Sequence, residues 1–151
     1  MGSDRLILVD TNVIVAALAE AHEHHAASLA LFSANPPLKI AVAAHCYAEA
    51  FTTLTRRSEH SPFRWPASET WAALESVAAA SRLVGLSPPQ SFEAVRDFAA
   101  AGQVGARVYD HLIARAARAA GIGLLVTWNI SHFEGLIEGV EIRTPAALLS
   151  S

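Results

Sequence analysis

Near its start the chain reads Leu6-Ile7-Leu8-Val9-Asp10, four apolar residues followed by an acid. An unbroken apolar run of this length is typical of a strand that is covered on both faces, as in a parallel sheet. Thr11 and Asn12 come next, and both are good helix caps, so we expect a helix over residues 13–18. Asp10 is therefore predicted to lie at the carboxyl end of a central strand.

The rest of the chain alternates between short apolar runs and longer segments with helical spacing. A second apolar run, residues 122–126, again ends in polar residues, Thr127-Trp128-Asn129. Strands are also expected at residues 38–42, 83–86 and 140–143, and helices at residues 23–34, 44–57, 68–80, 87–101 and 106–120, with a short one after Thr144-Pro145. In the helix over residues 68–80, the face formed by Trp71, Leu74, Val77 and Ala78 should be buried. This alternation predicts an α/β sandwich with a mostly parallel sheet.

The composition favours one compact domain without a membrane span. The chain has 151 residues, of which 52% are hydrophobic and 17% charged, so it can bury a sizeable core, and we expect a single domain over residues 1–151. Cys46 is the single cysteine, which excludes an internal disulfide and a multi-cysteine zinc site. The sequence shows neither a secretory leader nor an apolar run of roughly 20 residues, so a cytoplasmic location is the expectation.

The charge balance argues against a passive nucleic-acid binder. The net charge is -3 and the pI is near 6.1, whereas such binders usually carry a basic surface. An enzyme that reaches phosphate through bound cations is compatible with this balance, because the metal supplies positive charge locally. Six arginines could form a phosphate-contacting rim, although arginines on helix faces are more often solvated: Arg56, Arg57, Arg64, Arg107, Arg115 and Arg118.

Asp10 and the segment Thr127-Trp128-Asn129 are expected to meet at one edge of the sheet. In open parallel sheets, ligands bind beyond the carboxyl ends of the strands, where both segments are predicted to lie. A carboxylate that follows a buried strand is partly desolvated, which is costly unless it is paired, hydrogen-bonded or bound to a cation. The alternative is an Asp that only forms a turn or caps a helix.

Glu49 and Asp110 are further acids that could join this edge. Glu49 lies in a predicted helix with hardly any other charge before Arg56, although a solvated helix position would explain it as well. Asp110 borders the apolar side of the helix over residues 106–120, away from the stripe of arginines and His111 on the same helix. It could also simply compensate the helix dipole in the first turn.

Carboxylates on separate elements suit Mg²⁺ or Mn²⁺, which prefer oxygen ligands and retain waters able to attack phosphorus. Two such ions about 3.5–4 Å apart would stabilise both the attacking and the leaving oxygen of an in-line displacement. Thr127 and Asn129 are weak ligands, but they can orient a metal-bound water or a phosphate. The sequence leaves open whether one ion or two would bind.

Other chemistries have weaker support. His22, His24 and His25 could share a helix face around zinc, but no cysteine lies nearby, and the remaining histidines, His45, His60, His111 and His132, lack the spacing of the usual zinc sites. The chain contains neither a Gly-x-Ser-x-Gly elbow nor a Gly-x-x-x-x-Gly-Lys phosphate loop. An aspartyl phosphate at Asp10 would lack its usual companion acid, because position 12 is Asn.

Four segments resemble the PIN domain in their order and spacing. They are Val9-Asp10-Thr11-Asn12-Val13, Tyr47-Ala48-Glu49-Ala50-Phe51, Val108-Tyr109-Asp110-His111-Leu112-Ile113-Ala114 and Leu125-Val126-Thr127-Trp128-Asn129. Gly105 before the Asp110 helix and His132-Phe133 after the last segment add to the likeness. The pattern is most similar to the VapC-type toxins of bacterial type II toxin–antitoxin systems, and it spans nearly the whole chain.

The resemblance implies a PIN-like three-layer α/β sandwich and a Mg²⁺- or Mn²⁺-dependent endoribonuclease that hydrolyses RNA. Asp10, Glu49 and Asp110 would be catalytic metal ligands, with Asn129 at the fourth catalytic position, and Thr11 and Thr127 would orient substrate or water. The fourth position is often Asp in the family, so Asn129 removes one negative charge.

The resemblance also implies a homodimer and a cognate VapB-like antitoxin whose tail covers the active site. An alternative function, favoured by Asn129 and by the acidic pI, is a catalytically impaired PIN-like module that binds RNA or a protein partner.

Overall fold

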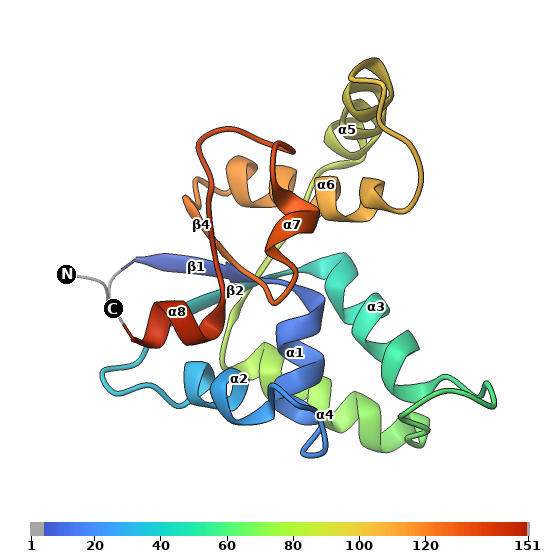
Figure 1. The fold of residues 1–151 in the computed structure, drawn as a ribbon, viewed down its shortest axis with the longest axis vertical. Helices are drawn as coiled ribbons and strands as arrows, with labels where there is room; N and C mark the ends of the chain where they lie inside the picture. Colours follow the sequence, from blue (N-terminus) through green and yellow to red (C-terminus); the bar gives the residue numbers. More distant parts are fainter. Residues whose placement is uncertain (1–4, 151) are drawn as a thin grey trace.

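One parallel sheet forms the centre of the computed structural model, which describes residues 5–150 (Figure 1). Its strands are β1 (Leu6–Val9), β2 (Lys39–Ala43), β3 (Arg82–Val84), β4 (Leu124–Val126) and β5 (Glu141–Arg143), in the order β3-β2-β1-β4-β5. Every pair is parallel, and Val9 lies beside Val42 on one side and Val126 on the other. The chain builds β2 and β3 on one side of β1 before it crosses to β4, so the strand order reverses at β1, where ligands of such sheets bind.

Helices cover both faces of this sheet. They are α1 (Thr11–Leu18), α2 (His25–Phe32), α3 (Ala44–Thr55), α4 (Ala67–Ala79), α5 (Pro88–Ala100), α6 (Arg107–Ala119), α7 (Ile130–Phe133) and α8 (Pro145–Leu149). In Figure 1, α1, α2 and α4 lie on one side of β1 and β2, whereas α5, α6 and α7 lie on the other. The structure thus confirms the predicted α/β fold with a helix–sheet–helix arrangement, while the single domain over residues 1–151 stays a prediction.

The two strands that carry polar residues at their ends, β1 and β4, are deeply buried. Leu8 and Val9 of β1, and Leu125 and Val126 of β4, have no exposed surface. Helices cover these strands on both faces, which is why their sequence is uniformly apolar instead of alternating. Packing therefore holds the carboxyl ends of β1 and β4 in place, and this fixes the positions of the residues that follow them.

Several predicted boundaries were wrong by a few residues, for identifiable reasons. α1 begins at Thr11 because Asp10 itself caps it, accepting a hydrogen bond from the Thr11 N–H. Ile122 does not belong to β4, because its N–H closes the end of α6 by donating to the Ala117 carbonyl across Gly121, whose φ is +71°. The short helix α7 was not predicted.

The predicted buried face of α4 was only half right. Thr70, Leu74 and Val77 form the buried ridge of this helix, but the Trp71 side chain is 58% exposed and Ala78 is exposed as well. The helix packs on α3 along a narrower strip than its apolar residues suggest. None of the helices in residues 5–150 has the length and apolarity needed to cross a lipid bilayer.

Candidate active site

Asp10 lies between β1 and α1, and both its backbone N–H and its carboxylate are hydrogen-bonded. Its backbone N–H donates to the Val126 carbonyl at 2.9 Å, which places it directly beside the end of β4. Its Oδ1 accepts from the Thr11 N–H at 2.7 Å, and its Oδ2 accepts from the Thr127 hydroxyl at 2.8 Å. The residue is only 5% exposed. The carboxylate is therefore held in one orientation at the carboxyl end of the sheet.

The pKa of Asp10 is raised to about 6, chiefly because the carboxyl is buried and to a smaller extent because Asp110 and Glu49 carry negative charge nearby. The hydrogen bonds from Thr127 and Thr11 act in the opposite direction, but they do not offset the loss of solvation. Asp10 is thus a carboxylate whose negative charge is poorly compensated by the protein itself. A bound cation would supply the missing compensation.

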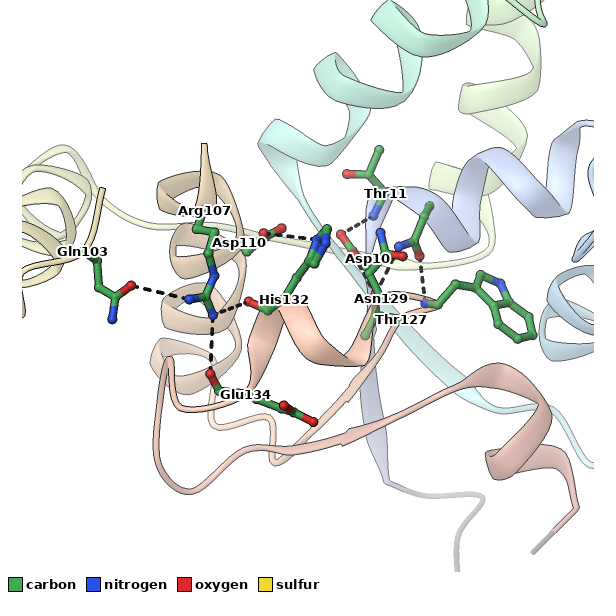
Figure 2. Close-up of polar contacts among 11 residues, drawn as sticks. Asp10, Thr11, Gln103, Arg107, Asp110, Thr127, Asn129, His132 and Glu134 are labelled. Carbon is green, nitrogen blue, oxygen red and sulfur yellow. Dashed lines mark hydrogen bonds and ion pairs between the residues drawn. The ribbon is translucent and has the colours of Figure 1, made fainter. Parts of the chain in front are cut away.

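The Thr127 hydroxyl connects the two strand ends, and all its hydrogen-bonding positions are filled. It donates to Asp10 and accepts from the Asn12 side-chain amide at 3.1 Å and from the Asn129 N–H at 3.0 Å. The Asn12 carbonyl oxygen in turn accepts from the Trp128 N–H at 3.1 Å. Thr127 has no exposed surface. This closed network, part of which Figure 2 shows, orients Asp10 and fixes the exit from β4.

Glu49 reaches the same place from α3, and Asp110 reaches it from the first turn of α6. The Thr11 hydroxyl donates to Glu49 Oε1 at 3.3 Å, which links this acid to the residue after Asp10. Burial raises the pKa of Asp110, and the charge of Glu49 raises it as well, whereas His132 and Arg107 lower it. Each of the three acids thus lies within electrostatic reach of the others.

Arg107 holds the segment after β4 against α6 (Figure 2). One of its terminal nitrogens donates to the carbonyls of His132 at 2.9 Å and Glu134 at 3.4 Å, and the other donates to Gln103 at 3.4 Å. This clamp places His132 Nδ1 3.8 Å from Asp110 Oδ2. Arg107 therefore serves the fold of the site, and the phosphate-contacting rim considered from the sequence stays a prediction.

The acids line an open cleft of about 290 Å³. Five of the six residues predicted for the site border it, and Thr127 lies buried beneath it. The Asn129 side chain is exposed and makes no hydrogen bond with any residue in the range 5–150. The structure thus brings all the predicted residues together: Asp10, Thr11, Glu49, Asp110, Thr127 and Asn129. Their catalytic roles remain predictions.

Sequence reasoning missed several residues of the cleft. Asn12 was interpreted only as a helix cap, whereas its amide joins the two strand ends. His22 and Phe63 also line the cleft, from the loops that follow α1 and α3. Neither loop carries a periodic pattern, so nothing in the sequence pointed to Phe63, and His22 was considered only as part of a zinc cluster.

The histidines are arranged differently from the zinc alternative considered from the sequence. The His24 ring stacks on Trp128 at 3.8 Å, and His25 Nδ1 is hydrogen-bonded to the Ala16 carbonyl at 2.9 Å, so the two rings have different partners. His45 was considered to lack ligand spacing, yet its ring, the Cys46 thiol and the Glu49 carboxylate bring their ligand atoms within 4.8 Å of one another. Burial raises the pKa of the Cys46 thiol to about 12.

The donor set of the cleft suits a hard divalent cation. Asp10, Glu49 and Asp110 offer oxygen ligands from three separate elements, as Mg²⁺ and Mn²⁺ prefer. Within residues 5–150, no arginine forms an ion pair with any of these three acids. The residues present therefore fit such an ion, because His132 and Arg107 near Asp110 and His45 beside Glu49 offset only part of the repulsion among the acids, and Asp10 has no basic partner among residues 5–150.

The fold and the cleft together define an α/β protein with an acidic site at the switch point of a parallel sheet. A family model described as "PIN domain" matches residues 7–132, most of the chain. The chain belongs to the PIN domain family. No curated protein sequence matches it.

Solved structures of VapC and VapBC proteins share its fold. VapC20 of Mycobacterium tuberculosis, described as a sarcin-ricin loop cleaving toxin, is 20% identical with a TM-score of 0.62, over 79% of this chain and 86% of that one. VapBC2 from Rickettsia felis, bound to a DNA fragment from its promoter, is 19% identical with a TM-score of 0.63, over 92% and 98%. VapBC-1 from nontypeable Haemophilus influenzae is 14% identical with a TM-score of 0.64, over 93% and 98%.

Proposed function

We propose that this protein is a metal-dependent endoribonuclease and the toxin of a toxin–antitoxin pair. The observation that carries the proposal is the convergence of Asp10, Glu49 and Asp110 on one cleft, with no arginine paired to them in the described part of the chain. Membership of the PIN domain family and the VapC-like fold support it. All three acids are proposed as ligands of Mg²⁺ or Mn²⁺.

Each residue around the ion would have a role that its position determines. A divalent ion in the cleft supplies an activated water and neutralises charge on the phosphate. Thr127 and Thr11 hold the carboxylates of Asp10 and Glu49 through hydrogen bonds. Asn129, exposed at the mouth of the cleft, can donate its amide N–H to a phosphate oxygen or to a water. It would therefore be a positioning group in place of a fourth metal-binding acid.

RNA is proposed as the substrate because VapC20 is described as cleaving the sarcin-ricin loop, and because the resemblance points to ribonuclease toxins. A VapB-like antitoxin is proposed as the partner because similar structures are VapBC complexes. A homodimer is proposed from the same resemblance, and the cytoplasmic location expected from the sequence is kept as a proposal. A small reading frame directly upstream that encodes a DNA-binding protein would support the antitoxin, and sedimentation of the purified chain as a monomer would contradict the dimer.

The ribonuclease is tested by cleavage of RNA with Mg²⁺ or Mn²⁺, with and without a chelator. We expect the parent chain to cleave RNA. Cleavage should be lost when chelator is added, and also in the variants Asp10→Ala and Glu49→Gln. Glu75→Gln is the matched control, since Glu75 is an exposed glutamate on α4 without a salt bridge among the described residues. Equal cleavage by the parent and Glu49→Gln would reject the proposal.

The exposed Asn129 also favours the second candidate, a PIN-like module that has lost catalysis. Calorimetric titration with Mn²⁺ separates the two functions. A retained catalytic site binds the ion in a way that Asp110→Asn abolishes, while an inert module binds none. Restoring a fourth carboxylate with Asn129→Asp is expected to tighten Mn²⁺ binding if the acids form one site.

A further inference from the structure

Three ligand-bearing side chains lie together on the first two turns of α3. His45, Cys46 and Glu49 bring a nitrogen, a sulfur and an oxygen within 4.8 Å of one another. His45 Nε2 lies 3.6 Å from Glu49 Oε1. That nitrogen is buried and has no hydrogen-bond partner within residues 5–150. A buried nitrogen without a partner is unusual and indicates that something else completes its surroundings.

Helix geometry explains why these side chains meet. His45 and Glu49 are four residues apart, and Cys46 and Glu49 are three apart, so all three share one face of α3. Cys46 has no exposed surface, while His45 and Glu49 are partly exposed, with side chains 33% and 38% accessible. The cluster therefore lies at the boundary of the core, with the Cys46 side chain buried and the other two side chains partly exposed.

The chemistry of this set differs from that of the carboxylate cluster. Mg²⁺ selects oxygen ligands, whereas imidazole and thiolate favour softer ions such as Zn²⁺. Three protein ligands and one open position are the usual arrangement of a zinc site that also holds water. The set contains one ligand of each type that zinc accepts, and two of the three are unsuited to Mg²⁺.

We propose that His45, Cys46 and Glu49 form a Zn²⁺ site that shares Glu49 with the carboxylate cluster. On binding, the Cys46 thiol loses its proton to solvent and its sulfur bonds the ion, and His45 binds through the unprotonated Nε2. An ion held there draws Glu49 away from the other acids. If the ribonuclease proposed above is correct, on which this consequence rests, Zn²⁺ lowers the Mn²⁺-dependent activity by competing for Glu49.

Co²⁺ is the probe for this site, because a thiolate bound to Co²⁺ gives a near-ultraviolet charge-transfer band that carboxylates do not give. We expect the band on titrating Co²⁺ into the full chain, and its loss when one equivalent of Zn²⁺ is added. Cys46→Ala should abolish the band, and His45→Gln should weaken Co²⁺ binding by at least about tenfold, as removal of a metal ligand or of its support typically does. Asp110→Asn, which alters only the carboxylate cluster, should retain the band.

The outcomes separate this site from the proposed nuclease. No band with the parent chain, or a band that survives Cys46→Ala, overturns the zinc site whatever the nuclease assay shows. If Cys46→Ala does not fold, as judged by circular dichroism, His45→Gln decides, because its partly exposed ring can be replaced without opening the core. If the band behaves as expected but the chain cleaves no RNA, the zinc site is supported and only the nuclease is rejected. Zn²⁺ that fills the site without slowing cleavage overturns the competition for Glu49.

Discussion

At the scale of single residues, Asp10 has two opposed effects on the stability of the fold. It caps α1 and joins β1 to β4, which stabilises the fold, yet its buried charge opposes folding. Its pKa rises from 3.8 to about 6 on folding. A carboxyl with a raised pKa binds its proton more tightly in the folded chain, so its contribution to stability is fully present below pH 3.8 and is lost as the pH rises through 6.

Asp10→Asn should therefore change the pH dependence of unfolding in metal-free protein. The pKa shift implies that the mutant gains on the parent by about 2 kcal/mol between about pH 4.5 and about pH 7.5, since one pKa unit corresponds to about 1.4 kcal/mol. Urea unfolding of both chains in chelator at each pH measures this difference. A difference that is the same at both values would show that burial does not perturb Asp10.

Thr127 is the second residue with a sharply defined role. Thr127→Val keeps the shape but leaves Asp10 Oδ2 without its donor, and the Asn12 amide and the Asn129 N–H without their acceptor. We expect a loss of about 1–3 kcal/mol in the free energy of unfolding, the cost of unsatisfied buried groups, together with weaker Mn²⁺ binding. Thr127→Ser retains the hydroxyl and should bind Mn²⁺ like the parent. Equal Mn²⁺ affinities for the Val and Ser variants would remove Thr127 from the support of the site.

At the scale of elements, the link between α6 and α7 depends on Arg107. Arg107→Gln removes the donors to the carbonyls of His132 and Glu134, so α7 should open more often. We expect faster amide hydrogen exchange over residues 130–136 and little change in β1. Arg118→Gln is the control, because Arg118 is an exposed arginine of the same helix. Exchange over residues 130–136 that is identical in the two variants would contradict the clamp.

The elements that could be predicted from sequence are those whose formation depends mainly on one property of their residues. β1 and β4 follow from unbroken apolar runs, because strands covered on both faces need nothing else. Trp71 was placed wrongly because periodicity gives the direction of a helix face but not the width of the surface that covers it. The helix α7 was missed since four residues, held by Phe133 and by the Arg107 clamp, show no period.

The residues of the candidate site likewise differ in how far the sequence could predict them. The approach of Asp10 to Thr127 and Asn129 follows from parallel strands ending at one edge. Glu49 and Asp110 lie on helices. The local sequence was equally consistent with a solvated position for Glu49, and it favoured a dipole-compensating role for Asp110, so the likeness to PIN domains was needed to select them. The cluster of His45 and Cys46 with Glu49 depends on side-chain directions within one turn, which the sequence alone did not reveal.

At the scale of the whole molecule, an ion in the cleft should stabilise the fold, because it compensates the three acids that otherwise repel one another. At Mn²⁺ concentrations about 100 times Kd, linkage gives about 2.7 kcal/mol, which raises Tm by about 5–10 °C in a chain of this size. Differential scanning calorimetry with and without chelator measures the shift. Glu75→Gln should retain it, and Asp110→Asn should lose most of it. A full shift in Asp110→Asn would place the stabilising ion elsewhere.

The uncompensated charge of Asp10 also bears on the lifetime of the protein in the cell. If the proposed ion binds in the cleft, the metal-free chain is the less stable form, so it spends more time unfolded and is the form that proteases remove first. Supply of divalent cation would then set not only the activity but also the abundance of the protein. Substitutions that discharge position 10 would escape this degradation, which means that inactive variants should accumulate to higher levels than the active chain.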